Sequence, residues 1–155
     1  MCSSDLLAAA DMLESEYEIA ADVWSVTSFT ELARDGMAVE RWNRLHPEAT
    51  PRVTWVEQCL KDRNGPAIAA TDYVRSYAEP IRAWLNRPYT VLGTDGFGRS
   101  DTREHLRRFF EVDRAHICVA ALKALADQEV VPAAVVSGAI AKFGVGADMM
   151  EPWRA

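Results

Sequence analysis

The sequence predicts an α/β fold built on a parallel sheet. Short apolar, strand-like runs alternate with amphipathic helical segments, an order typical of strands joined by helical crossovers. The 155 residues are 49% hydrophobic and 26% charged, which is ordinary for a globular protein. A chain of this length accommodates one domain, and no internal repeat, low-complexity run or interior linker divides it.

The N-terminal segment combines a helical pattern with an abrupt beginning. Apolar side chains recur at helical spacing from Leu6 to about Tyr17, which predicts a helix there. The first residues, MCSSDL, look like the translation of a sequencing-adapter end. We therefore interpret residues 1–6 as a non-native scar and residues 7–155 as the domain. Cys2, which lies in the scar, is then given no function. We also expect the native protein to continue upstream.

The next stretch changes from strand to helical patterning. ADVWSVT, Ala21 to Thr27, alternates its side chains between two faces and predicts a strand covered on both sides. Ser28 with Glu31 three residues later is a capping-box pattern. It predicts a short helix that stops near Gly36.

The middle of the chain predicts two helices, a strand and a third helix. The asparagine–glycine–proline turn at residues 64–66 precedes the strand. Asp72 is a good N-cap for the third helix, and Pro80 is expected to kink it. These four elements are expected over Val39–Leu45, Pro51–Lys61, Ala67–Thr71 and Tyr73–Leu85.

The C-terminal part predicts one more strand and then three helices. Asp101 is expected to cap the first of these helices, and Pro132 to begin the last. These four elements are expected over Tyr89–Gly93, Asp101–Glu111, Ala115–Asp127 and Pro132–Gly144.

Charge and hydropathy exclude several classes of partner. The formal net charge is -6, with 17 Lys+Arg against 23 Asp+Glu, which argues against nucleic acid and anionic membrane as partners. No apolar run approaches the ~20 residues of a membrane span, and no signal-peptide pattern is present. Cys59 and Cys118 lie in helical apolar patterns and are expected to be small core residues, which suits a reducing cytoplasm.

A glycine-rich loop, GTDGFGRSD, follows the second predicted strand. Its glycines, Gly93, Gly96 and Gly98, reverse the order of the dinucleotide fingerprint, and no lysine follows them as a Walker-type phosphate loop requires. A carboxylate at Asp101 would also occupy amide donors that a phosphate needs. We interpret the loop as a turn in which glycine permits positive φ and close packing, and keep phosphate binding as the alternative.

Other polar residues allow a functional and a structural reading. Asp72, Asp95 and Asp101 lie at or near the carboxyl ends of predicted strands, where ligands usually bind in open α/β sheets. The structural interpretation, which we favour, makes Asp72 and Asp101 helix caps and Asp95 a turn residue. The histidines lack metal-ligand spacing and a nucleophilic partner, so we expect surface or packing roles. They are His46, His105 and His116.

Five tryptophans are abundant for one domain of this length, so we expect some to face a partner. They are Trp24, Trp42, Trp55, Trp84 and Trp153.

Several sequence blocks resemble the C-terminal region of the bacterial homodimeric pyruvate dehydrogenases, from about Ala9 to Trp153. GTDGFGRSDTRE and VTSFTELARDG are specific to this type, whereas transketolases at large share only a looser D-x-F-G-type loop. The other blocks are ERWNRLHP, TPRV, ATDY and ALKALAD.

The resemblance implies a three-layer α/β/α transketolase C-terminal fold with a mixed, mostly parallel sheet of five strands. The parent enzyme decarboxylates pyruvate with thiamine diphosphate and magnesium, and reductively acetylates the lipoyl group of dihydrolipoyl acetyltransferase. Its diphosphate–magnesium motif, activating glutamate and active-site histidines belong to upstream domains. No catalytic, cofactor-binding or metal-binding residue is therefore carried onto this sequence. We expect an inactive, dimer-supporting domain of a cytoplasmic homodimer.

The sequence departs from the family pattern at three points. The strand ending in a T/S-G-S-type turn before the first helix is absent, so the sheet is expected to lack a strand between Ala21–Thr27 and Ala67–Thr71. Glu18 stands where a glycine helix terminator is expected, and Pro80 interrupts a helix. The alternative to the family function is an independent α/β module that binds a small ligand or phosphate through Gly93–Asp101.

Overall fold

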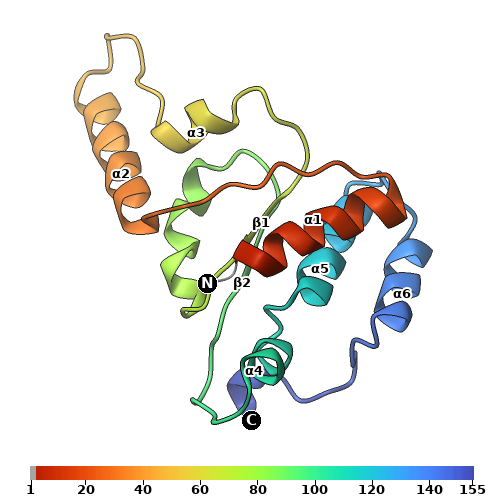
Figure 1. The fold of residues 1–155 in the computed structure, drawn as a ribbon. Helices are drawn as coiled ribbons and strands as arrows, with labels where there is room; N and C mark the ends of the chain where they lie inside the picture. Colours follow the sequence, from red (N-terminus) through yellow and green to blue (C-terminus); the bar gives the residue numbers. More distant parts are fainter. Residues whose placement is uncertain (1–2) are drawn as a thin grey trace.

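A two-stranded parallel sheet lies at the centre of the computed structural model, which describes residues 3–155 (Figure 1). Strand β1, Ala67–Ala70, pairs with β2, Tyr89–Leu92, with Ala67 opposite Tyr89 and Ala70 opposite Leu92. Both strands were predicted and are confirmed, as is the α/β class. The sheet has two strands within the described residues rather than the five that the family resemblance implies.

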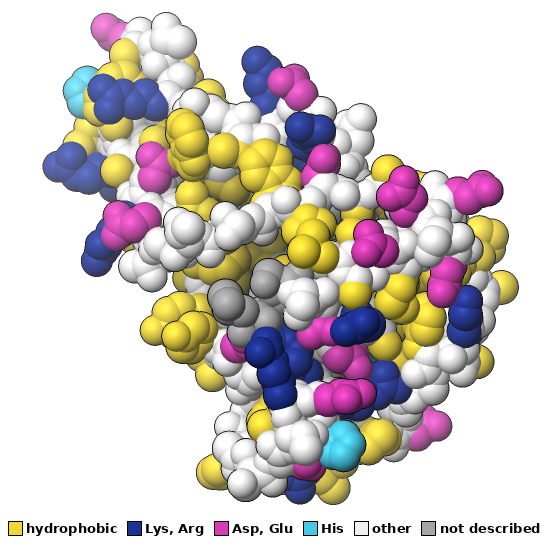
Figure 2. Space-filling model, viewed as in Figure 1, with side chains coloured by type: hydrophobic (Ala, Val, Ile, Leu, Met, Phe, Trp, Pro, Cys, Tyr) yellow, Lys and Arg dark blue, Asp and Glu magenta, His cyan; other side chains and the backbone are white. Residues whose placement is uncertain are grey.

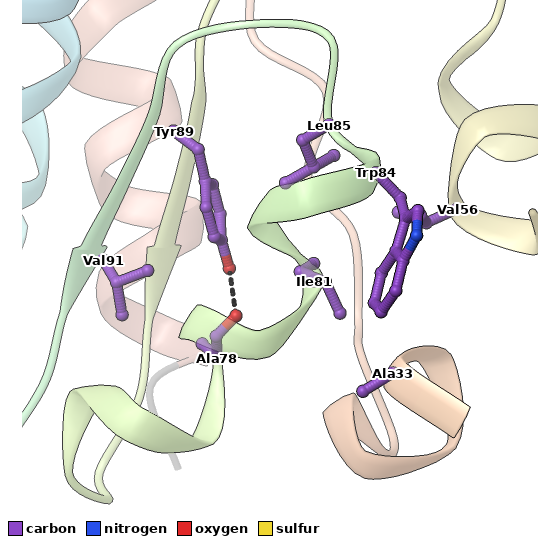
Figure 3. Packing of buried hydrophobic residues seen from close by; sticks show 8 residues of the cluster. All are labelled: Ala33, Val56, Ala78, Ile81, Trp84, Leu85, Tyr89 and Val91. Carbon is purple, nitrogen blue, oxygen red and sulfur yellow. Dashed lines mark hydrogen bonds between the residues drawn. The ribbon is translucent and has the colours of Figure 1, made fainter. Parts of the chain in front are cut away.

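The sheet lies between two helical layers because alternate strand residues face opposite sides. One face of the sheet packs into a hydrophobic cluster with side chains from residues 29–60 and 78–85. The strands contribute Ala67, Ala69, Tyr89 and Val91 to this cluster. Ile68 faces the other way, into a cluster built from the N-terminal and C-terminal helices. Figure 3 shows the first cluster, in which the buried hydroxyl of Tyr89 donates a hydrogen bond to the carbonyl oxygen of Ala78 at 3.0 Å.

Three helices form one layer, and each was predicted. Helix α1 (Ser3–Tyr17) packs on α5 (Arg114–Asp127), which also packs on α6 (Ala133–Lys142). Met1 and Cys2 lie outside the described residues, whereas residues 3–6 form the first turn of α1. The assignment of residues 1–6 as a scar stays a prediction. Glu18 follows α1 with φ +57°, the conformation that glycine favours at this place.

In the opposite layer, helices α2 and α3 differ from the predicted helix boundaries. Helix α2 (Phe29–Leu45) runs without a break through Gly36, where the sequence predicted a stop and a second helix. Ser28 is its N-cap and accepts a hydrogen bond from the Glu31 amide, as predicted. Helix α3 (Trp55–Leu60) begins later than Pro51, because Thr54 and Glu57 form a reciprocal capping box there.

The segment after β1 is not the predicted kinked α-helix. It forms two 3-10 turns, η1 (Arg75–Tyr77) and η2 (Glu79–Trp84), and Pro80 is the second residue of η2. Pro80 cannot donate to an α-helical ladder, and the Asp72 carboxylate is turned to Arg107 instead of capping this segment.

The predicted strand at residues 21–27 is also wrong. In Figure 1 this segment runs as an extended connection from α1 to α2, outside the sheet. Its backbone forms no hydrogen bond with other backbone groups of the described chain. Trp24 is 47% exposed and Val26 40% exposed. A β-prone sequence forms a strand only beside a neighbour, and none lies here.

The glycine loop leads to α4 (Arg103–Phe109), which lies below the sheet in the view of Figure 1, and Gly96 of the loop packs on the C-terminal turn η3 (Pro152–Arg154). Among the described residues, no helix combines the length and apolar character that crossing a bilayer demands.

Candidate functional site

The candidate site lies where the chain leaves the carboxyl ends of β1 and β2. The Thr94 amide donates to the Tyr73 carbonyl oxygen at 2.9 Å, and the Thr94 hydroxyl donates to the Asp72 carbonyl oxygen at 2.9 Å. The two segments that follow the strands are therefore joined to each other. Of the three aspartates singled out from the sequence, Asp72 and Asp101 line one pocket, whereas Asp95 pairs with Arg75.

Two glycines of the loop are required by close packing. A Cβ atom at Gly93 would stand 2.8 Å from the Tyr73 carbonyl oxygen and the Arg75 amide nitrogen. Gly96 has φ +115°, and a Cβ atom there would stand 2.5 Å from the carbonyl oxygen of Pro152. The prediction of a turn with a glycine at positive φ is confirmed at Gly96.

The loop is also fastened to the C-terminal turn by charge and by an aromatic ring. Arg75 Nε lies 2.5 Å from an Asp95 carboxylate oxygen, and its guanidinium carbon lies 4.7 Å from the centre of the Trp153 ring. Asp95 is thus an ion-pair partner, which the sequence did not indicate. Together with Gly96 against Pro152, these contacts make the loop a binding surface for the chain's own C-terminus.

A buried arginine links the site to the first helix. Arg107, with 8% of its side chain exposed, lies with Nε 2.6 Å from Asp5 Oδ2 and Nη1 2.8 Å from Asp72 Oδ1. Its Nη2 donates to the Val112 carbonyl oxygen at 2.9 Å. This network was not predicted from the sequence, because Asp5 lies within residues 1–6, which were interpreted as a scar. The available signal was Arg107 on the apolar side of a helix, beside Leu106 and Phe110.

Asp101 is not the N-cap of α4, contrary to the sequence prediction. Thr102 has the extended N-cap conformation, and its hydroxyl accepts from the His105 amide at 3.3 Å. Asp101 stands one residue earlier and accepts from the Thr102 amide at 2.7 Å and from His105 Nδ1 at 3.0 Å. The Thr102 amide and then His105 lower the pKa of Asp101.

An open pocket of about 630 Å³ lies between the loop and α4. Its floor is apolar, from Leu106, Phe110 and Val112. Three arginines and two aspartates line the rest, so its formal charge is positive although the chain is acidic. The remaining lining residues are Asp72, Thr94, Gly96, Gly98, Arg99, Asp101, Arg103 and Arg107.

The histidines lie apart, and each has a local partner. His46 stacks on Trp42 at 4.5 Å and contacts the Trp42 carbonyl oxygen at 2.8 Å. His116 lies with Nδ1 2.6 Å from Asp113, the N-cap of α5. Within residues 3–155, no three His, Cys, Asp or Glu side chains are grouped as metal ligands.

The cysteines and the tryptophans differ in how deeply they are buried, and whether any tryptophan faces a partner stays a prediction. Cys118 is buried, and burial raises the pKa of its thiol to about 11, which keeps the sulfur protonated and unreactive. Cys59 is partly buried. Trp84 is in the core, whereas Trp55 is 59% exposed and Trp153 46% exposed.

The face seen in Figure 2 carries both apolar and charged side chains. A group of hydrophobic side chains lies in its upper part, near α2 and α3, with charged side chains around it, and acidic and basic side chains lie next to one another in the lower part, below α1. The lower part is the region of the arginine and aspartate network described above.

The donor set around the pocket does not fit a thiamine diphosphate–magnesium site. Magnesium requires carboxylate or carbonyl oxygens arranged about one point. The two pocket carboxylates are directed elsewhere: Asp72 to Arg107, and Asp101 to the Thr102 amide and His105. No step of cofactor chemistry is therefore assigned to these residues.

Comparison with known proteins gives a family and a set of relatives. The family model described as the transketolase-like TK C-terminal domain matches residues 4–113. The pyruvate dehydrogenase E1 component of Pseudomonas aeruginosa is 57% identical over 145 residues, which is 93% of this chain. Those of Cupriavidus necator and Escherichia coli K12 are 53% and 52% identical over 148 and 145 residues, or 96% and 93% of this chain. The chain spans 16% of the length of each relative.

Proposed function

The chain belongs to the family of transketolase-like C-terminal domains, and we propose that it is the non-catalytic, dimer-supporting C-terminal domain of a pyruvate dehydrogenase. The parent would be a thiamine-diphosphate- and magnesium-dependent cytoplasmic oxidoreductase. It would decarboxylate pyruvate and reductively acetylate the lipoyl group of dihydrolipoyl acetyltransferase. The high identity to pyruvate dehydrogenase E1 components over nearly the whole chain supports the parent assignment.

The observation that carries the structural role is the packing of the glycine loop. Gly96 lies against the Pro152 carbonyl, and Arg75 bridges Asp95 and Trp153, so the loop serves the internal architecture of the domain. The partners in this proposal are the upstream domains of the same polypeptide and the second subunit. Exposed apolar side chains such as Trp24 and Trp55 are available for such contacts.

A chimera tests the dimer-supporting role. In the Escherichia coli enzyme, this chain would replace the region that it matches, and a second version would end before that region. We expect the chimera to sediment as an active dimer. The truncated version should lose dimerisation more than thiamine diphosphate binding in the upstream domains. A truncated enzyme that stays a fully active dimer would contradict the proposal.

The absence of a cofactor role is tested on the chain itself. We expect no saturable binding of thiamine diphosphate with Mg²⁺ by calorimetry, and no decarboxylation of pyruvate. Micromolar binding of the cofactor would show that the chain is more than a supporting domain.

A further inference from the structure

Gly98 is a glycine that the fold does not require. Unlike Gly93 and Gly96, it has no other atom within 4 Å of where a Cβ would stand, and its φ lies outside the left-handed region. Gly98 lines the pocket, so a side chain there would occupy the open pocket space. The missing side chain leaves the backbone open to a ligand.

The loop around Gly98 has unused hydrogen-bond donors. None of the amide groups of residues 96–100 donates to an acceptor within residues 3–155. Consecutive amides with a glycine that allows close approach are suited to an anion. The Asp101 carboxylate, which could have taken them, accepts from the Thr102 amide and His105.

Arginines supply the charge at the same place. Arg99 and Arg103 line the pocket next to Gly98, and Arg107 forms its inner wall. Arg99 is held over the Phe109 ring at 4.1 Å, and Arg107 is fixed between Asp5 and Asp72. The planar guanidinium fork matches phosphate oxygens. In a chain with a net charge of -6, Arg99 brings positive charge to the open part of the pocket, next to the loop amides around Gly98.

We propose that this pocket binds a small phosphate ester. The phosphoryl group lies on the amides of residues 97–100 with Arg99, and the organic part lies on the apolar floor of Leu106 and Phe110. The site is separate from the dimer-supporting role, because it uses the open side of the loop rather than the side packed on Pro152.

Calorimetric titration of the 155-residue chain tests this site. The probes are phenyl phosphate, inorganic phosphate and sodium benzoate, at low ionic strength. We expect phenyl phosphate to bind more tightly than inorganic phosphate, because only the ester covers the apolar floor. Benzoate should bind more weakly than phenyl phosphate, and added salt should weaken all three. Equal binding of benzoate and phenyl phosphate would contradict a phosphate site.

Two variants and one control separate the site from general stability. Gly98→Ala should keep the melting temperature and weaken phenyl phosphate at least about tenfold, because the added methyl group keeps the phosphoryl group from reaching the loop amides and so prevents their charge-assisted hydrogen bonds. Arg99→Gln should weaken it similarly. Gly138→Ala, on α6 with open space around its Cβ, should leave binding unchanged.

The proposal is overturned if phenyl phosphate shows no saturable binding, or if Gly98→Ala and Arg99→Gln bind it like the wild type. Repeating the comparison in the chimera, first saturated with thiamine diphosphate, makes the result independent of the stability of the isolated chain. A chimera that dimerises but does not bind phenyl phosphate would refute this site and leave the dimer-supporting role intact.

Discussion

Gly36 faces the indole of Trp84 so closely that a Cβ at position 36 would overlap three of its ring carbons. The glycine lies inside α2 and is buried. The Trp84 Nε1 donates to Glu40 Oε1 at 3.0 Å, one turn further along the same helix. The tryptophan is therefore held against α2 by contact at one end and by a hydrogen bond at the other.

We expect Gly36→Ala to lower the free energy of unfolding by about 1–3 kcal/mol, because the added methyl group displaces Trp84 from a packed core. Urea unfolding followed by tryptophan fluorescence measures it. The control is Gly138→Ala in α6, where nothing lies within 4 Å and alanine should be neutral or stabilising by about 0.5–1 kcal/mol. Equal effects at both positions would contradict the role assigned to Trp84.

The N-cap of α4 predicts which of two neighbouring residues matters for stability. Thr102→Ala should cost about 1 kcal/mol, because it removes the acceptor for the His105 amide. Asp101→Ala should cost less, since the Asp101 side chain is half exposed and bonds to the amide of its neighbour. Thermal unfolding of both variants, with exposed Thr50→Ala as control, tests the order. A larger effect at Asp101 would restore the original assignment.

Asp113 predicts how stability changes in acid. Burial raises the pKa of its carboxyl, but hydrogen bonds from His116 and Arg108 outweigh burial and bring the pKa down to about 2. A carboxyl group whose pKa is lower in the folded than in the unfolded protein stabilises the fold at pH values above its unfolded-state pKa. That contribution, about 2 kcal/mol, is lost as the pH falls from about 4 to 2.

Asp113→Asn keeps an N-cap side chain but removes the charge. The variant should be less stable than the wild type at pH 6 and should lose less stability between pH 4 and 2. Urea unfolding at a series of pH values measures both. Parallel stability curves for the two proteins would contradict the assignment.

The isolated chain is expected to be marginally stable and prone to self-association. Residues 21–27 combine an unpaired backbone with exposed Val23, Trp24 and Val26. Within the described residues, strand β1 is also paired along one edge only. The amides of Ala67 and Thr71 donate towards β2, so the backbone N–H and C=O groups of Ile68 and Ala70 point to the opposite, unpaired edge of the strand. Light scattering and calorimetry test this. A monomer that melts cooperatively above ~50 °C would contradict it.

The sequence predicted the elements whose signal is local. Strands β1 and β2, and helices α5 and α6, were found where apolar periodicity and flanking turn residues agree. Gly36 was misread as a helix end because its partner, Trp84, lies 48 positions further along the chain. Residues 21–27 were misread because strand formation depends on a neighbour that sequence pattern does not reveal.

At the candidate site, the sequence indicated the right loop but not its contacts. The positive φ of Gly96 and the grouping of strand-end residues could be predicted, since both follow from residue type and strand order. The partners of Arg75, Arg107 and Asp72 could not. They come from segments distant in the chain, and only the tertiary structure brings them together.

The two clusters of buried side chains differ in how their residues are spaced along the chain. The cluster around Trp84 and Tyr89 uses residues 29–91, so it can assemble while later residues are still being synthesised. The other joins Leu13 to Cys118, Leu122 and Val136, across more than a hundred residues. Its formation closes a long loop, which is entropically costly and slow. During synthesis on the ribosome, the apolar face of α1 should therefore stay exposed to solvent until α5 has been synthesised. A chaperone would be needed during this interval to cover that face.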